Sequence, residues 1–164
     1  MLKSFQHETT NNFSNPVINR HFIIRNFNTK NKTMENRDTF LIDLRGEPLG
    51  TISAQSTSEE VFQNRTLRPI LVLQNELFIE VFLNYAIKQK NVFFSMTPDR
   101  KMAYIENVIQ RDIKFRNSLK GIIIGLFTVE EYKEYIRNSS NINKRMMNML
   151  IERLKSQVMI LEMD

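Results

Sequence analysis

The chain has 164 residues, of which 41% are hydrophobic and 25% charged, and it contains no cysteine. This length and composition indicate one globular domain with an appended tail, and the absence of cysteine excludes disulfides, thiolate metal ligands and cysteine nucleophiles. The formal charge of +5 permits nucleic-acid binding but does not indicate it.

Residues 1–57 predict a flexible N-terminal arm. Residues 1–33 are rich in asparagine, which favours turns over helices. Met34 is a second candidate start, so residues 1–33 are either native or an over-extended reading of the gene. Gly46, Pro48 and Gly50 mark turns, so we expect residues 34–57 to be extended rather than helical. The FLIDL run within them either docks on the helical body or stays loose.

Residues 58–164 predict an all-α domain, a compact bundle of about five helices. Thr57 with Glu60, or Ser56 with Glu59, fits a capping box at the start of a short first helix.

The stretch from Pro69 to Lys90 predicts a central helix. Arg68 precedes a proline, so the chain should break or kink there, and Pro69 suits the first turn of the new helix. Apart from a narrow stripe that includes Glu76 and Glu80, the helix is apolar around most of its circumference, so we expect other helices to wrap it. The two glutamates interrupt it too much for a membrane span.

A third helix should begin with Thr97 as the N-cap and Pro98 at its first position. Its apolar stripe continues to Leu119 or Lys120, where Gly121 can end it. Residues 121–127 (GIIIGLF) form either a helical continuation or an extended connector, and the helical neighbours favour helix.

Two further helices follow. Thr128 and Glu131 fit a second capping box, and Ser140 or Asn141 should cap the last helix. The apolar arc of the last helix spans roughly 200°, about twice the width of an ordinary surface stripe. Its methionines are either core filling or part of a contact with a second subunit or partner. The candidate interface residues are Met146, Met147, Met149, Leu150, Leu154 and Val158.

A cluster of charges is the candidate site. On one continuous helix from Pro98, Asp112 and Arg116 fall within the apolar stripe, where charges need partners. They form an ion pair that reaches Glu76 or Glu80, line a pocket for an anionic ligand, or are exposed by a local distortion. The sequence therefore predicts either a buried ion cluster or a small-ligand site.

Metal binding and familiar catalytic chemistry are not favoured. The only histidines, His7 and His21, lie in the doubtful leader, whereas helical-bundle metal sites usually combine carboxylates with histidine. We therefore expect no metal, no cofactor and no catalytic residue of a known motif. Residues 128–154 have the outline of a helix-turn-helix motif. Because the second helix is apolar around much of its circumference, we expect it to lie in the core rather than in a DNA groove.

The strings FQNRTLRPIL, NELFIEVFLNYAIKQKN, IENVIQRDIKFRNSLKGIIIGLFTVEEY and NKRMMNMLIERLKSQV cover most of residues 60–158. Over this range the chain resembles a family of small uncharacterised helical proteins from bacteria of the Bacteroidota, of which some carry the label glyoxalase. The residues argue against that activity, because glyoxalase I-type enzymes use βαβββ modules and a histidine-containing metal site.

The sequence favours a non-enzymatic, cytoplasmic interaction or regulatory protein that self-associates through its last helix. No apolar run after a basic region opens the chain, so we expect neither a secretory signal nor a membrane. The alternatives are a pocket or enzyme site for an anionic ligand around the Glu/Asp/Arg cluster, and weak nucleic-acid binding.

Overall fold

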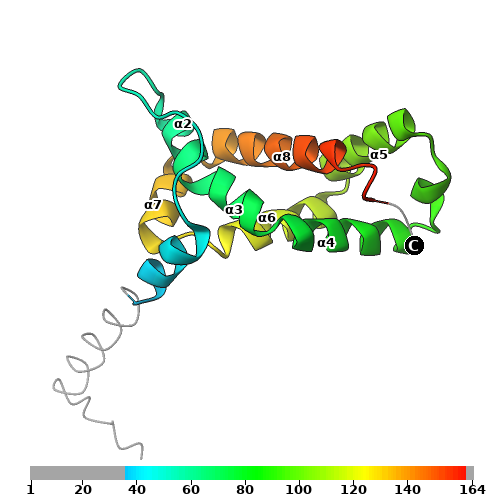
Figure 1. Cartoon of the computed structure of the whole chain (residues 1–164), viewed down its shortest axis with the longest axis horizontal. Helices are drawn as coiled ribbons and strands as arrows, with labels where there is room; N and C mark the ends of the chain where they lie inside the picture. Colours follow the sequence, from blue (N-terminus) through cyan, green and yellow to red (C-terminus); the bar gives the residue numbers. More distant parts are fainter. Residues whose placement is uncertain (1–35, 162–164) are drawn as a thin grey trace, which may run out of the picture. The chain divides into compact units, whose positions relative to one another are not determined.

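Helices form the regular structure of residues 36–161, the part of the chain that the computed structural model describes (Figure 1). No strand occurs in this part, so the predicted all-α class is confirmed. The prediction of an arm in residues 1–33 lies outside the described residues. From Ser58 the elements are α2 (Ser58–Phe62), a π-helical stretch (Gln63–Leu67), α3 (Arg68–Leu73), α4 (Asn75–Lys88), a 3₁₀ turn (Val92–Ser95), α5 (Pro98–Arg111), α6 (Ile113–Ile124), α7 (Val129–Arg137) and α8 (Ser139–Ser156).

Seven α-helices therefore occupy residues 58–156 of the described chain, where the sequence predicted about five. The difference arises because two of the predicted helices are each broken once. The helix predicted from Pro69 to Lys90 is broken at Gln74, where α2–α3 and α4 meet at a bend of 62°. The helix predicted from Pro98 is broken at Asp112.

The break at Gln74 is stabilised by contacts with the end of α8. The Asn75 side chain donates to Gln157 Oε1 (3.1 Å) and accepts from Gln157 Nε2 (2.7 Å) and Arg153 Nη1 (3.1 Å). These bonds join residues about eighty positions apart, so no local sequence pattern predicts the bend.

The break at Asp112 is an N-cap. Asp112 has extended backbone angles, and its Oδ1 accepts from Phe115 N–H at 3.0 Å to begin α6. Gly121 does not end this helix: residues 121–124 are helical, as the sequence favoured.

A π-helical stretch joins α2 to α3, so the break expected at Arg68 is absent. Arg68 keeps α-helical angles, and its N–H donates to the carbonyl of Gln63, five residues back. Pro69 has no N–H, so the Asn64 carbonyl lacks a helical donor. The Leu49 N–H donates to that carbonyl at 2.9 Å, and the Asn64 side chain donates to Thr51 O at 2.8 Å. The missing N–H of Pro69 thus leaves the Asn64 carbonyl free to accept the hydrogen bond that anchors residues 49–51.

The prediction of an extended arm is wrong for residues 36–45, which are helical. Leu41 is buried against the rest of the chain, while Phe40, Ile42 and Leu44 stay exposed. The turns marked by Gly46 and later residues begin only after this helix ends. The division of the chain lies between Thr33 and Met34, so the described residues of the predicted arm, 36–57, belong with the helices.

Two predicted capping boxes are present at the starts of α2 and α7. Thr57 pairs with Glu60 and Thr128 with Glu131, each with both reciprocal hydrogen bonds. The last helix starts differently from the prediction: Asn138 is its N-cap, and it makes no side-chain capping bond.

The helix at the centre of the packing is α8. It contacts α5, α6, α7 and the π-helical stretch. The apolar core residues of α8 are Ile142, Met146, Met147, Leu150, Ile151 and Leu154. The wide apolar arc is therefore covered within one chain.

The predicted wrapping of the stretch from Pro69 is only half correct. Phe78, Phe82 and Ala86 of α4 are fully buried, but Leu77 and Ile87 are nearly half exposed. The helix lies at the edge of the packed helices, because α8 occupies their centre. Within residues 36–161 no single helix has the length and apolarity to cross a membrane, although α2–α3 and α4, as a bent pair, meet both criteria together.

Candidate functional site

The four charged residues predicted to cluster do not come together. Glu76 and Glu80 are exposed on the outer side of α4. Asp112 Oδ2 accepts from the Tyr85 hydroxyl at 3.1 Å, and Arg116 Nη1 donates to the Gln110 carbonyl at 3.1 Å. Because α5 ends before Asp112 and α6 begins after it, Arg116 does not lie on the same face as the apolar stripe of α5. A single ion cluster of these residues is therefore wrong.

Asp112 is a capping residue rather than a catalytic one. The Phe115 N–H holds the pKa of Asp112 below its usual value, and the Tyr85 hydroxyl adds to the effect. Burial, followed by the bond to Asp112, raises the pKa of Tyr85 to about 12. Both groups therefore keep one protonation state near neutrality.

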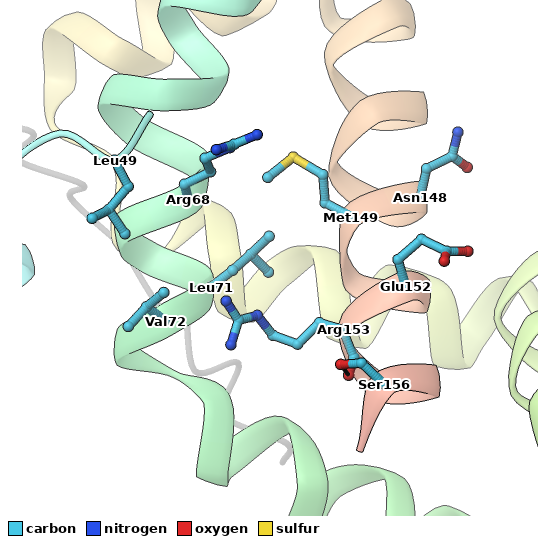
Figure 2. Close-up of a pocket in the computed structure, with 9 residues that line it drawn as sticks. All are labelled: Leu49, Arg68, Leu71, Val72, Asn148, Met149, Glu152, Arg153 and Ser156. Atoms are coloured by element: carbon cyan, nitrogen blue, oxygen red, sulfur yellow. Dashed lines mark hydrogen bonds between the residues drawn. The ribbon is translucent and has the colours of Figure 1, made fainter. Parts of the chain in front are cut away.

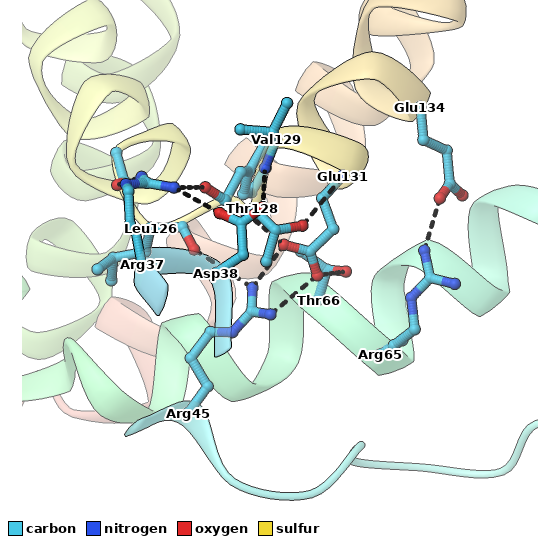
Figure 3. A network of polar contacts seen from close by, with 12 residues as sticks. Arg37, Asp38, Arg45, Arg65, Thr66, Leu126, Thr128, Val129, Glu131 and Glu134 are labelled. Carbon is cyan, nitrogen blue, oxygen red and sulfur yellow. Dashed lines mark hydrogen bonds and ion pairs between the residues drawn. The ribbon is translucent and has the colours of Figure 1, made fainter. Parts of the chain in front are cut away.

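The buried ion pair of the structure is Arg45 with Glu131 (Figure 3). The guanidinium is bidentate, with Nη1 2.8 Å from Oε2 and Nη2 2.9 Å from Oε1. The same carboxylate accepts from the Thr66 hydroxyl at 2.7 Å and from Thr128 N–H at 2.8 Å. The side chains of Arg45 and Glu131 are only 4% and 8% exposed.

Glu131 stays ionised in this position. Burial alone would raise its pKa, but the bonds from Arg45, Thr128 and Thr66 outweigh it, so the pKa lies below the usual 4.5. Its carboxylate accepts from three different residues, which leaves no open position for a substrate. The pair therefore holds elements together and offers no reactive group.

The same segment also bonds to the turn between α6 and α7. Arg37 donates to the carbonyls of Phe127 (3.0 Å) and Gly125 (3.1 Å), which are unpaired at the end of α6. Asp38 Oδ2 accepts from Val129 N–H at the start of α7, at 3.0 Å. These residues were missed by sequence reasoning, because each partner lies about ninety positions away.

The predicted interface residues of α8 are mostly inside the chain. Met146, Met147, Leu150, Leu154 and Val158 are each less than 9% exposed. Met149 alone is partly exposed. Five of the six residues therefore offer little surface to a second copy, and self-association through this set stays a prediction.

An open groove lies beside Met149, between α3 and the C-terminal half of α8. We call it the α3–α8 groove, and its volume is about 620 Å³. Figure 2 shows Arg68 and Leu71 of α3, and Met149 and Arg153 of α8, pointing into the space between the helices. The remaining lining residues are Leu49, Val72, Asn148, Glu152 and Ser156.

The charged residues of the α3–α8 groove differ in whether their charge is compensated. Glu152 lies 3.4 Å from Lys155, so its charge is partly compensated outside the groove. Arg153 bonds only the neutral amide of Asn75 among the described residues, and Arg68 forms no ion pair with them. The groove therefore combines an apolar floor with two guanidinium groups that have no ion-pair partner among the described residues.

Arg116, one of the predicted site residues, lines a different groove on the other side of α8, together with Lys120 and Lys144. Among residues 36–161, no group of three or more histidine, cysteine, aspartate or glutamate side chains is placed to hold a metal ion.

The fold is that of an all-α protein with two open grooves beside its central helix. Comparison with known proteins found no matching family model, no matching curated protein and no matching solved structure. The resemblance to the Bacteroidota family stays a prediction.

Proposed function

We propose that this chain is a non-enzymatic interaction protein and that its binding surface is the α3–α8 groove. The observation that carries the proposal is the groove itself: an open apolar channel with Leu71 as its buried floor and arginines on both walls. Apolar surface rimmed by polar groups is typical of protein-binding sites. Arginine is also enriched among the residues that contribute most to such interfaces.

The partner that fits is an amphipathic helix with aliphatic side chains on one face and carboxylates beside them. Such a helix lays its apolar face in a groove between two helices, as in other helix-in-groove complexes. Val72 and Leu49 extend the apolar floor outward, since they are 49% and 38% exposed. The partner's carboxylates would meet Arg68 and Arg153.

The one hydroxyl in the groove supports a binding role rather than a nucleophilic one. Ser156 Oγ donates to the Arg153 carbonyl at 2.7 Å, so its proton is used within the last turn of α8. No base is in contact with it among the described residues.

The test is affinity purification of the full-length chain from its native cells, followed by direct binding with the recovered partner. Val72→Glu places a carboxylate of the chain's own in the groove, where it competes for the two arginines. Ile136→Glu is the matched control, because Ile136 is 54% exposed on α7, outside the groove.

The proposal predicts a partner that binds the wild type and the Ile136→Glu variant and is lost with Val72→Glu. Charge reversal by Arg68→Glu should also weaken binding, whereas Arg100→Glu on α5 should not. Equal binding by Val72→Glu and the wild type would contradict the proposal. The proposal would also be contradicted if light scattering showed that the chain binds only a second copy of itself and that the Val72→Glu variant forms this dimer equally well.

A further inference from the structure

A second groove lies on the other side of α8, where the ends of α5 and α6 meet it. We call it the basic groove, and its volume is about 390 Å³. Its cations are Arg116 and Lys120 from α6 and Lys144 from α8. None of the described residues that line it is acidic, whereas the α3–α8 groove includes Glu152. Three positive charges therefore face one concave surface without a carboxylate among them.

The break between α5 and α6 builds this groove. Because the chain turns at Asp112, the last turn of α5 and the first turns of α6 face α8 together. Arg116 Nη1 donates to the Gln110 carbonyl across the break at 3.1 Å, which fixes the guanidinium at the groove wall. A straight helix through these residues would carry Gln110 and Arg116 onto different faces.

A neutral donor is oriented beside the cations. The buried Tyr135 donates its hydroxyl to Asn143 Oδ1 at 3.0 Å. The amide oxygen of Asn143 is thus occupied, and its NH₂ group is left as a donor. Asn117 and Asn148 add two further amides at the rim. Such a set of donors and cations suits a multiply charged oxyanion.

The floor of the basic groove is apolar. Ile109, Met147 and Ile151 line it, and all three are buried. Because these three side chains are at most 7% exposed, the floor offers little surface for a ligand to cover, and the size of the groove is what argues for an organic part beyond the phosphates. The volume lies in the range of about 300–1,000 Å³ that is usual for small-molecule sites.

We infer that the basic groove binds a small phosphorylated organic molecule of about mononucleotide size. Its phosphates lie against Arg116, Lys120 and Lys144, and its organic part fills the rest of the groove beside Met147 and the amides of Asn117 and Asn148. A long nucleic acid fits less well, because the three cations converge on one hollow instead of following an extended track.

The test is calorimetric titration of the full-length chain with adenosine diphosphate, with inorganic pyrophosphate, and with uncharged adenosine. Lys120→Gln with Lys144→Gln removes two groove charges at positions that no described core contact needs. Arg111→Gln with Lys114→Gln removes the same charge from exposed positions nearby, outside the groove. Circular dichroism melting checks that both double variants fold.

We expect saturable one-to-one binding of adenosine diphosphate, weaker binding of pyrophosphate, and the weakest binding of adenosine. The groove double variant should lose affinity at least about ten-fold, which corresponds to about 1.4 kcal/mol, while the control stays within about two-fold. The Met147 methyl signal should shift on addition of adenosine diphosphate.

Three results would overturn the inference: no binding at millimolar ligand, equal loss in both double variants, or tight binding confined to long single-stranded oligonucleotides. The Val72→Glu variant should bind adenosine diphosphate as the wild type does, so failure here is separate from failure of the proposed protein-binding function.

Discussion

Replacing Arg45 by methionine tests the buried ion pair in isolation. The substitution keeps most of the side-chain length but removes both bonds to Glu131, which lie at 2.8 and 2.9 Å. In the wild type the Glu131 side chain is only 8% exposed, and in the variant it keeps only Thr66 and Thr128 as donors. Breaking a buried pair in this way typically destabilises a protein by about 3–5 kcal/mol. That is a large part of a usual folding free energy of about 5–15 kcal/mol.

The matched control is Arg65→Met. Arg65 also pairs with a glutamate of α7, Glu134, but those side chains are 44% and 36% exposed. An exposed pair is screened by solvent and usually contributes less than about 1 kcal/mol. The two variants remove the same side chain from pairs that differ in burial, so the difference between them isolates the effect of the buried site.

The effect of pH gives a second, independent signature. In the wild type the pKa of Glu131 is below its usual 4.5, so its stabilising contribution is present above pH 4.5 and is lost as pH falls through the folded-state pKa. Without Arg45, burial is the largest remaining influence on Glu131, so the folded-state pKa of this carboxyl should rise relative to the wild type. The variant then carries a penalty at neutral pH that is relieved as the carboxyl takes up a proton.

The free-energy difference between wild type and Arg45→Met should therefore be largest near pH 7 and smaller near pH 4. Urea unfolding followed by circular dichroism at both pH values measures it. A loss no greater than that of Arg65→Met, or a difference that does not change with pH, would show that the pair does not stabilise the fold as described.

Three further substitutions test local features. Gly46→Ala should cost about 1 kcal/mol for its positive φ alone, since φ is +72° and no atom lies within 4 Å of the added Cβ. Gly50→Ala should cost about 2–3 kcal/mol, because φ is +101° and the added Cβ meets Arg68 Nη1 at 2.8 Å and Asn64 at 3.2 Å; equal costs in urea unfolding would contradict this. Asp112→Asn keeps an N-cap residue but removes its charge, so the pKa of Tyr85 should fall from about 12 while staying above its usual value of 10.0 because burial persists. Carbon-13 NMR titration of the tyrosine rings checks this, and a wild-type pKa near 10 would refute it.

Features that depend on neighbouring residues could be predicted from the sequence. The capping boxes at Thr57 and Thr128 need partners only three residues away, and both are present. Thr97 and Pro98 likewise marked the start of α5 correctly, since proline fixes φ and needs no donor there.

Features that depend on distant contacts could not be predicted. Asp112 continues the helical pattern of its neighbours, so nothing local distinguishes a cap from a mid-helix residue. A continuous helix through Asp112 would put Arg116 on the apolar stripe of α5. The predicted cluster with Glu76, Glu80 and Asp112 depended on that continuous helix, which the structure does not have. Arg45 precedes the turn residue Gly46, and nothing near it in the sequence marks it as half of an ion pair, because its partner Glu131 lies 86 positions away. Glu131 was predicted as a capping residue, and its second role required the fold.

Both proposals depend on the packing of α8, whose apolar face is filled by the chain's own helices while open grooves lie beside it. The most direct measurement is NMR of methyl-labelled methionines with a soluble paramagnetic agent, at concentrations where light scattering shows a monomer. We expect attenuation of Met149, which borders the α3–α8 groove, and of Met159, which is 71% exposed. Met146 and Met147, at 0% and 7% exposure, should be protected. Attenuation of Met146 in the monomer, or protection of Met149, would contradict this packing of α8.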